Sequence, residues 1–225
     1  MRKAFTITVE DHSGAARTGR IRTPHGAIET PAFAPVASQG TVKALLHDRV
    51  KKLGADLILV NAYHLYLRPG LETIAECSGI HEFISWRGPI LSDSGGFQLY
   101  SLPPLVKVTQ EGVRFSSHLD GTKIFLRPED VVDIQRSLGT DIMMVLDYFL
   151  PFPSTKARLK EAVKLTSLWA RRSKDRFLEK PARQQLWGIT QGSVFWDLRQ
   201  QSIEDLLAIE FDGYALGGLG IGEPK

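Results

Sequence analysis

Residues 90–98 read ILSDSGGFQ, a run that begins as an apolar strand and ends in a polar turn. Ile90 and Leu91 predict a buried strand, and Asp93 stands where that strand ends. The two glycines that follow allow the backbone to approach a ligand closely or to adopt a positive φ. Strands of this kind recur along the chain, short and uniformly apolar, and helices alternate with them. This alternation predicts parallel βα units.

Hydrophobic periodicity and turn residues locate the other elements. Strands are expected at residues 32–37, 57–60, 89–91, 142–146, 185–189 and 214–216. Helices are expected at residues 42–53, 70–77, 128–138, 156–178 and about 194–209. An open doubly wound sheet and a (β/α)8 barrel both satisfy this alternation. Polar residues after the strands favour the barrel, whose active sites lie at the carboxyl ends of its strands. No Gly-x-Gly-x-x-Gly follows the first strand, which weakens the dinucleotide-binding alternative.

The expected fold class is therefore α/β, of the (β/α)8 TIM-barrel type, and incomplete. About six βα units are present where a closed barrel has eight, so we expect the chain to be truncated relative to its natural fold. Residues 1–31 carry short alternating stretches and predict an N-terminal β-hairpin cap. Residues 32–225 form the partial barrel, with a β-insertion at about 103–127 after the third strand.

Composition narrows the class of protein. The chain has 225 residues, a net charge of +3 and 43% hydrophobic residues, which is enough for a substantial core. No apolar stretch approaches the ~18 residues of a membrane span, and no signal peptide is apparent. Cys77 is the single cysteine, which excludes an internal disulfide and a thiolate-rich metal site, and indicates a reducing cytoplasm. Among the histidines, His81 looks exposed, and no His/Cys/carboxylate spacing resembles a metal site.

Four expected strand ends carry polar side chains or bare backbone that suit a bound ligand. Asp93 follows the third strand, Asp147 the fourth, Gln191 the fifth and Gly218 the sixth. Two acids, an amide and exposed backbone offer acceptors and donors in one plane, as recognition of a heterocyclic base edge requires. Ordinary turns with aspartate as a side-chain cap are the alternative interpretation of Asp93 and Asp147.

Longer motifs resemble one family closely. The matches are Thr23-Pro24-His25-Gly26, Glu29-Thr30-Pro31, residues 61–70 (NAYHLYLRPG), residues 92–98 (SDSGGFQ), Gly112-Val113 through Asp120-Gly121, Gln191-Gly192-Ser193 and residues 211–218 (FDGYALGG). In this order they cover nearly the whole chain and resemble the tRNA-guanine transglycosylases.

The resemblance implies a cytoplasmic enzyme of queuosine biosynthesis. It exchanges guanine at the wobble position of the tRNA anticodon loop for a 7-deazaguanine base, either the aminomethyl precursor preQ1 or queuine. Asp93 is implied as the acid/base residue, with Ser94 beside it, and Phe97 as the platform on which the base stacks. The implied readers of the base edge are Asp147, Gln191 and the backbone of Gly218 and Leu219. Family members commonly dimerise, so a homodimer is an expectation for the full-length form.

Two departures from the family pattern affect the expected activity. The implied covalent nucleophile, a second aspartate, would lie beyond Lys225, as would a zinc site of three cysteines and one histidine. Because base exchange needs a nucleophile that holds the ribose, we expect this chain alone to be inactive. In addition, Phe149 replaces a small cysteine that bacterial members usually carry on the pocket wall, which leaves the identity of the incoming base open.

Three other interpretations stay open. A non-catalytic relative of the same fold is one, although the presence of Asp93, Asp147 and Gln191 argues for catalytic ancestry. A fragment that neither folds nor binds well is another. An unrelated barrel enzyme such as an aldolase would need a Schiff-base lysine at a strand end, and none stands there.

Overall fold

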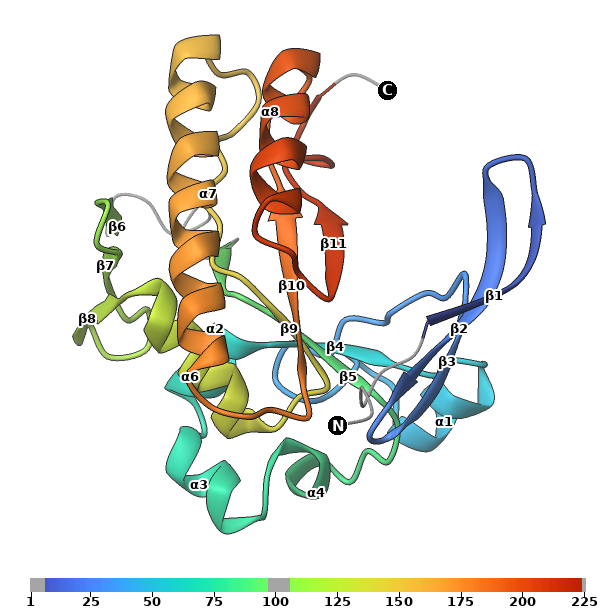
Figure 1. Cartoon of the computed structure of the whole chain (residues 1–225). Helices are drawn as coiled ribbons and strands as arrows, with labels where there is room; N and C mark the ends of the chain where they lie inside the picture. Colours follow the sequence, from blue (N-terminus) through green and yellow to red (C-terminus); the bar gives the residue numbers. More distant parts are fainter. Residues whose placement is uncertain (1–6, 97–105, 224–225) are drawn as a thin grey trace. The chain divides into compact units, whose positions relative to one another are not determined.

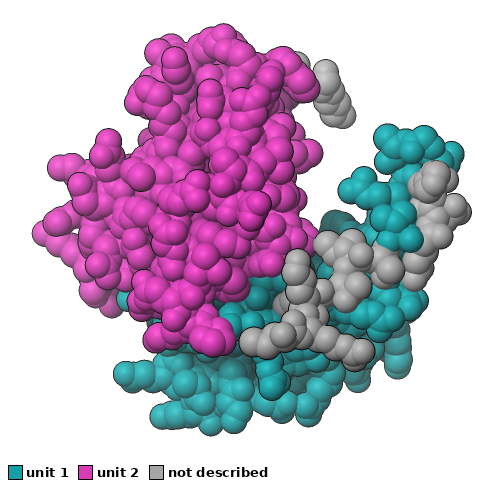
Figure 2. All heavy atoms as spheres, viewed as in Figure 1, with its two compact units in different colours: residues 1–93, 134–143, 182–185 teal, residues 94–133, 144–181, 186–225 magenta. Residues whose placement is uncertain are grey.

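The computed structural model of the chain describes residues 7–96 and 106–223 (Figure 1). The chain folds into two compact units, which Figure 2 distinguishes by colour. Unit 1 comprises residues 1–93, 134–143 and 182–185, and unit 2 comprises residues 94–133, 144–181 and 186–225. The division expected at residue 31 is not among these boundaries, so a separate cap of residues 1–31 stays a prediction.

Unit 1 begins with an antiparallel sheet whose strand order is β1-β2-β3. The strands are β1 (Ile7–Ser13), β2 (Ala16–Thr23) and β3 (Gly26–Thr30). Gly14, with φ of +60°, allows the tight turn between β1 and β2, which form the expected hairpin. The sequence did not predict β3, which pairs Ile28 with Ile21 of β2 and buries the Ile28 side chain.

Parallel strands form the main sheet of unit 1. They are β4 (Ile58–Asn61), β5 (Ile90–Asp93) and the first residues of β9 (Ile142–Met144). Asn61 is in register with Asp93, and Leu91 with Ile142. Most of their apolar side chains are buried, as expected for parallel strands that are covered on both faces.

Unit 2 continues the parallel arrangement with β10 (Gln185–Thr190) and β11 (Gly213–Leu216). The amide of Val145, just after β9, donates to the carbonyl of Trp187 in β10 across 3.1 Å. These pairings give the order β11-β10-β9-β5-β4. In Figure 1, helices α7 (Lys156–Leu178) and α8 (Trp196–Leu207) lie side by side. Their core cluster consists of Leu150, Leu159, Ala162, Val163 and Leu198.

The expected helices are present with two differences. Helices α6 (Pro128–Leu138) and α7 have the expected bounds, and α3 (Leu71–Glu76) lies within its expected range. Helix α1 (His47–Lys52) begins five residues later than expected, because Ala44 has a φ of +64°, outside the helical region. The sequence did not predict α2 (Ala62–Leu67) and α4 (Ile80–Ile84).

The strand expected at residues 32–37 is wrong. Only an isolated bridge joins Val36 to Leu59 there, with hydrogen bonds from Ala37 N and to Pro35 O. Pro31 and Pro35 have no amide hydrogen, so this segment cannot donate a full ladder. The described residues thus form a mixed α/β fold with a parallel sheet of five strands.

The expected β-insertion is an antiparallel sheet in unit 2 with the order β6-β7-β8. Its strands are β6 (Val106–Val108), β7 (Val113–Ser116) and β8 (Lys123–Leu126). Residues 103–105 of the expected range lie outside the described residues. In the part of the chain that the structure describes, no helix has the length and apolar character of a membrane span.

Candidate functional site

Asp147 is a buried carboxylate that follows β9 in unit 2. Nε2 of Gln191 donates to its Oδ2 across 2.6 Å, and Oγ of Ser94 donates to its Oδ1 across 3.2 Å. Burial raises the pKa of Asp147 to about 6, although the hydrogen bonds from Ser94 and Gln191 act in the opposite direction. Asp147 is therefore an acceptor at neutral pH that gains a proton in mild acid.

Contacts fix both the backbone and the side chain of Gln191. The backbone N–H of Gln191 donates to Oγ of Ser202 in α8 across 2.9 Å. A Cβ added at Gly217 would lie 2.7 Å from Nε2 of Gln191, and one added at Gly218 would lie 2.6 Å from Oε1. Because real Cβ atoms do not come this close, glycine at both positions is needed to keep the side-chain amide where it is.

Gly96 plays the corresponding role beside the carboxylate. A Cβ added there would lie 2.3 Å from Oδ1 of Asp147. The amide of Gly96 donates to Oγ of Ser94 across 3.2 Å, which orients the hydroxyl that binds Asp147. The glycine pair was predicted to allow close approach to a ligand, but the contact of Gly96 with Asp147 was not predicted. No local signal identifies it, because the two residues are far apart in the sequence.

The space beside this cluster is small. A cavity of about 10 Å³ is lined by Tyr148, Phe149, Leu150, Leu159, Ala162, Gln191, Gly192, Ser193 and Gly218. That volume is about what one water molecule needs. Phe149, which replaces the expected cysteine, is part of this wall.

Asp93 ends β5 in unit 1 and has its own partners. Nδ2 of Asn61 donates to its Oδ2 across 2.6 Å, and the amide of Ala62 approaches its Oδ1 at 3.3 Å. Oδ1 of Asn61 accepts from the amide of His64 and caps α2. Asn61 thus fixes both the carboxylate and the start of a helix. Asn61 belongs to the family motif at residues 61–70 but was not predicted as a site residue.

The structure brings together four of the seven residues predicted for the site. Ser94, Asp147, Gln191 and Gly218 lie in one cluster of unit 2. Asp93 belongs to unit 1 and is joined to Ser94 by the chain itself. Leu219 is 48% exposed. Phe97 lies outside the described residues.

A second polar cluster in unit 1 contains His25, His81 and Asp141. Nδ1 of His25 lies 2.9 Å from Oδ1 of Asp141, and Nε2 of His81 lies 3.2 Å from Oδ2. His81 was expected to be exposed, which is wrong: its side chain is buried, with 8% exposure, and contacts Asp141, 60 residues away in the sequence. Burial acts to raise the pKa of Asp141, but hydrogen bonds from His81, His25 and the Ile90 amide lower it on balance.

Sequence spacing indicated no metal site, yet these three residues hold their ligand atoms within 4.8 Å of one another. The imidazole rings of His25 and His81 are stacked, with centroids 3.5 Å apart and planes inclined by 18°. A metal ion lies near the plane of each imidazole that binds it, which two stacked rings cannot both satisfy. The arrangement therefore fits hydrogen bonding, in which each ring donates to a different carboxylate oxygen.

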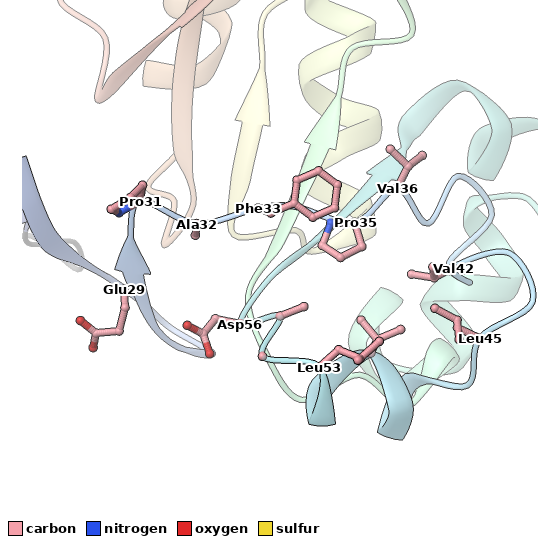
Figure 3. Close-up of a pocket in the computed structure, with 13 residues that line it drawn as sticks. Glu29, Pro31, Ala32, Phe33, Pro35, Val36, Val42, Leu45, Leu53 and Asp56 are labelled. Carbon is pink, nitrogen blue, oxygen red and sulfur yellow. The ribbon is translucent and has the colours of Figure 1, made fainter. Parts of the chain in front are cut away.

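An apolar pocket of about 580 Å³ also lies in unit 1 (Figure 3). Its lining includes Phe33, which is 80% exposed, together with Val36 and Leu53. Glu29 and Asp56 are its only charged side chains, and no lining side chain has a hydrogen-bond donor. The pocket therefore lacks the mixed donors and acceptors with which a base edge is read.

A zinc site of three cysteines and a histidine does not fit the residues of this chain. Cys77 is the single cysteine in the sequence, and it is exposed. No step of the chemistry can be assigned to zinc from these residues.

Comparison with known proteins gives consistent matches. The family model described as Queuine tRNA-ribosyltransferase matches residues 11–225. The queuine tRNA-ribosyltransferase of Thermodesulfovibrio yellowstonii is 55% identical over 221 residues, which cover 98% of this chain and 57% of that protein. Those of Nitratidesulfovibrio vulgaris and Pelotomaculum thermopropionicum are 51% and 49% identical, covering 98% and 100% of this chain. The chain spans 57% to 60% of the length of these relatives.

Proposed function

The chain belongs to the queuine tRNA-ribosyltransferase family, and from that premise we propose that the whole protein exchanges guanine in tRNA for a 7-deazaguanine base. The exchanged position is the wobble base of the anticodon loop, and the incoming base is preQ1 or queuine. The protein acts in the cytoplasm, as a homodimer. Its parallel units belong to a (β/α)8 barrel that the whole protein completes, with residues 1–31 as a cap and residues 32–225 within the barrel.

The observation that carries this proposal is the pairing of Asp147 with Gln191. Guanine presents N–H donors and a carbonyl acceptor on one edge. A carboxylate can accept from the N–H groups while a side-chain amide donates to the carbonyl. Asp147 and Gln191 supply this pair of groups from one buried cluster. Adenine presents the opposite pattern at the corresponding positions, so the pair favours guanine-type bases.

Asp147 and Gln191 are hydrogen-bonded to each other in the structure. The 2.6 Å hydrogen bond between Gln191 and Asp147 has to be replaced by bonds to the base. Ser94 keeps its bond to Oδ1 and orients the carboxylate during this exchange. The close approach of Gly218 to Gln191 supports a role for its backbone, with that of Leu219, in reading the same edge. Phe97 completes the site as a stacking platform.

Asp93 is the proposed acid/base residue of the reaction. Its carboxylate is positioned by Asn61 and by the amide of Ala62. Donors of this kind fix the orientation of a carboxylate that has to give a proton to the departing guanine and take one from the incoming base. A ping-pong exchange also needs a nucleophile that holds the ribose while the bases are exchanged. The family resemblance assigns that step to a second aspartate, in the part of the relatives that this chain does not cover.

The test is incorporation of radiolabelled guanine into unmodified tRNA by the whole protein. We expect incorporation that requires guanine at the wobble position, and its loss in Asp93→Asn and Asp147→Asn variants. Replacement of that guanine by adenine in the tRNA is the matched control. Incorporation that ignores the wobble base, or that both variants retain, would contradict the proposed function.

A further inference from the structure

The β6-β7-β8 sheet has two unlike faces. Side chains alternate between the faces of a strand, so residues in cross-strand register share one face. Lys107, Arg114 and Phe125 form one such row, and all three are exposed. Ser116 and Lys123 form the next row on the same face. The opposite face carries the buried side chains of Val113, Phe115 and Leu126.

The exposed face is basic and carries an aromatic ring. Among the described residues, no carboxylate forms an ion pair with Lys107, Arg114 or Lys123, whereas Arg172 and Arg176 of α7 bind carboxylates. Residues 97–105, outside the described part, contain no acidic residue in the sequence. The guanidinium of Arg114 lies 5.1 Å from the ring centroid of Phe125. The positive charge of this face is therefore available to a ligand.

We propose that this face binds the phosphodiester backbone of the tRNA substrate, outside the base-reading cluster. The inference rests on the proposed function, because that function supplies the RNA. Three cations on one exposed surface attract phosphates, and their contacts release counterions from the RNA. Phe125, held by Arg114, offers a face on which an unpaired base can stack. A hollow of about 300 Å³ along the three strands, lined by Lys107, Arg114 and Lys123 among others, gives the backbone a place to lie.

The experiment measures the affinity of the 225-residue chain for unmodified tRNA over a range of salt concentrations. The test variant is Lys107→Gln/Arg114→Gln/Lys123→Gln, and the matched control is Arg171→Gln/Lys180→Gln/Arg183→Gln, which removes the same charge from exposed positions elsewhere. Thermal melting verifies that both variants fold. We expect the test variant to bind roughly tenfold more weakly at low salt, with a log–log salt slope shallower by about 2. The control variant should show a much smaller loss of tRNA affinity and a much smaller change in salt slope.

Three results would overturn the inference. One is a test variant that binds tRNA as tightly as the wild type, or no more weakly than the control variant. Another is wild-type binding that poly-glutamate displaces as well as tRNA does, which would indicate an acidic protein partner instead. The last is a wild-type chain that binds no tRNA. If that folded chain still binds guanine, only this inference fails, and if it binds neither ligand, the assignment of Asp147 and Gln191 as base-reading residues fails as well.

Discussion

Nε2 of Gln191 donates to Oδ2 of Asp147 across 2.6 Å, which joins the residue after β10 to the carboxylate after β9. The two side chains therefore satisfy each other while the neighbouring cavity is only about 10 Å³. Buried polar groups of this kind need hydrogen-bond partners, and here each side chain supplies the partner of the other. The same pair offers an acceptor and a donor to a guanine-type base once the hydrogen bond opens.

Replacing Asp147 with asparagine should change how stability depends on pH. Burial raises the pKa of Asp147 from 3.8 to about 6, so the folded state holds its proton more tightly than the unfolded state. Wild-type stability therefore falls as pH rises through that window, by about 3 kcal/mol. The Asp147→Asn variant lacks this loss. Urea unfolding at about pH 4 and pH 8 should show that the free energy of unfolding of the variant rises relative to that of the wild type as pH increases. A difference in free energy of unfolding that is equal at both pH values would refute the raised pKa of Asp147.

Gly96→Ala should destabilise unit 2 and weaken base binding together. The new methyl group would stand 2.3 Å from Oδ1 of Asp147, so the carboxylate or the turn has to move. We expect a loss of about 2 kcal/mol in the free energy of unfolding. Gly121→Ala is the control, because its Cβ meets nothing within 4 Å and only its φ of +75° is strained. Equal losses in the two variants would mean that the contact with Asp147 is unimportant.

Asn61→Asp tests the link between Asn61 and Asp93. The substitution keeps the acceptor that caps α2 but turns the donor to Asp93 into a second carboxylate. Two carboxylates this close repel, so we expect a loss of about 2 kcal/mol at neutral pH that shrinks in acid as one of them is protonated. Asn61→Ala should lose the cap as well, with a much flatter pH dependence. Chemical denaturation at several pH values distinguishes them, and an acid-insensitive loss in Asn61→Asp would count against the 2.6 Å contact.

Asp141→Asn should reveal the role of the two histidines that bind this carboxylate. Hydrogen bonds from His81, His25 and the Ile90 amide outweigh burial and lower the pKa of Asp141. A lowered pKa contributes stability above the ordinary aspartate range, and that contribution is lost as pH falls below it. We expect the variant to be about 2 to 4 kcal/mol less stable at neutral pH, with a smaller difference near pH 2. A constant difference across that range would show that ionisation of Asp141 plays no part.

Elements with strong local signals were predicted well from the sequence. Helix α6 begins at Pro128 with two acidic residues in its first turn, and it has the expected bounds. Helix α7 is long and amphipathic, with Thr155 as its N-cap. The expected strand at residues 32–37 failed because prolines interrupt its donors, an effect that apolar composition alone conceals.

Those site residues that have a local sequence signal were also predicted. Asp147 and Gln191 stand at the ends of apolar strands, and parallel strands carry such residues to one edge of a sheet. His81 contacts Asp141, and Gly96 closely approaches Asp147, in each case across a long stretch of the sequence. Tertiary contacts of this kind are not encoded by local periodicity, so neither was predicted.

The most direct test of the account is equilibrium binding of free bases to the 225-residue chain, measured by calorimetry. We predict that guanine and a 7-deazaguanine bind and that adenine does not. Guanine affinity should fall as pH drops below about 6, where Asp147 gains a proton. The Asp147→Asn variant should bind guanine at least tenfold more weakly, by about 1.4 kcal/mol or more. Equal affinity for guanine and adenine, or undiminished guanine binding in Asp147→Asn, would contradict the assignment of Asp147 and Gln191 as the residues that read the base.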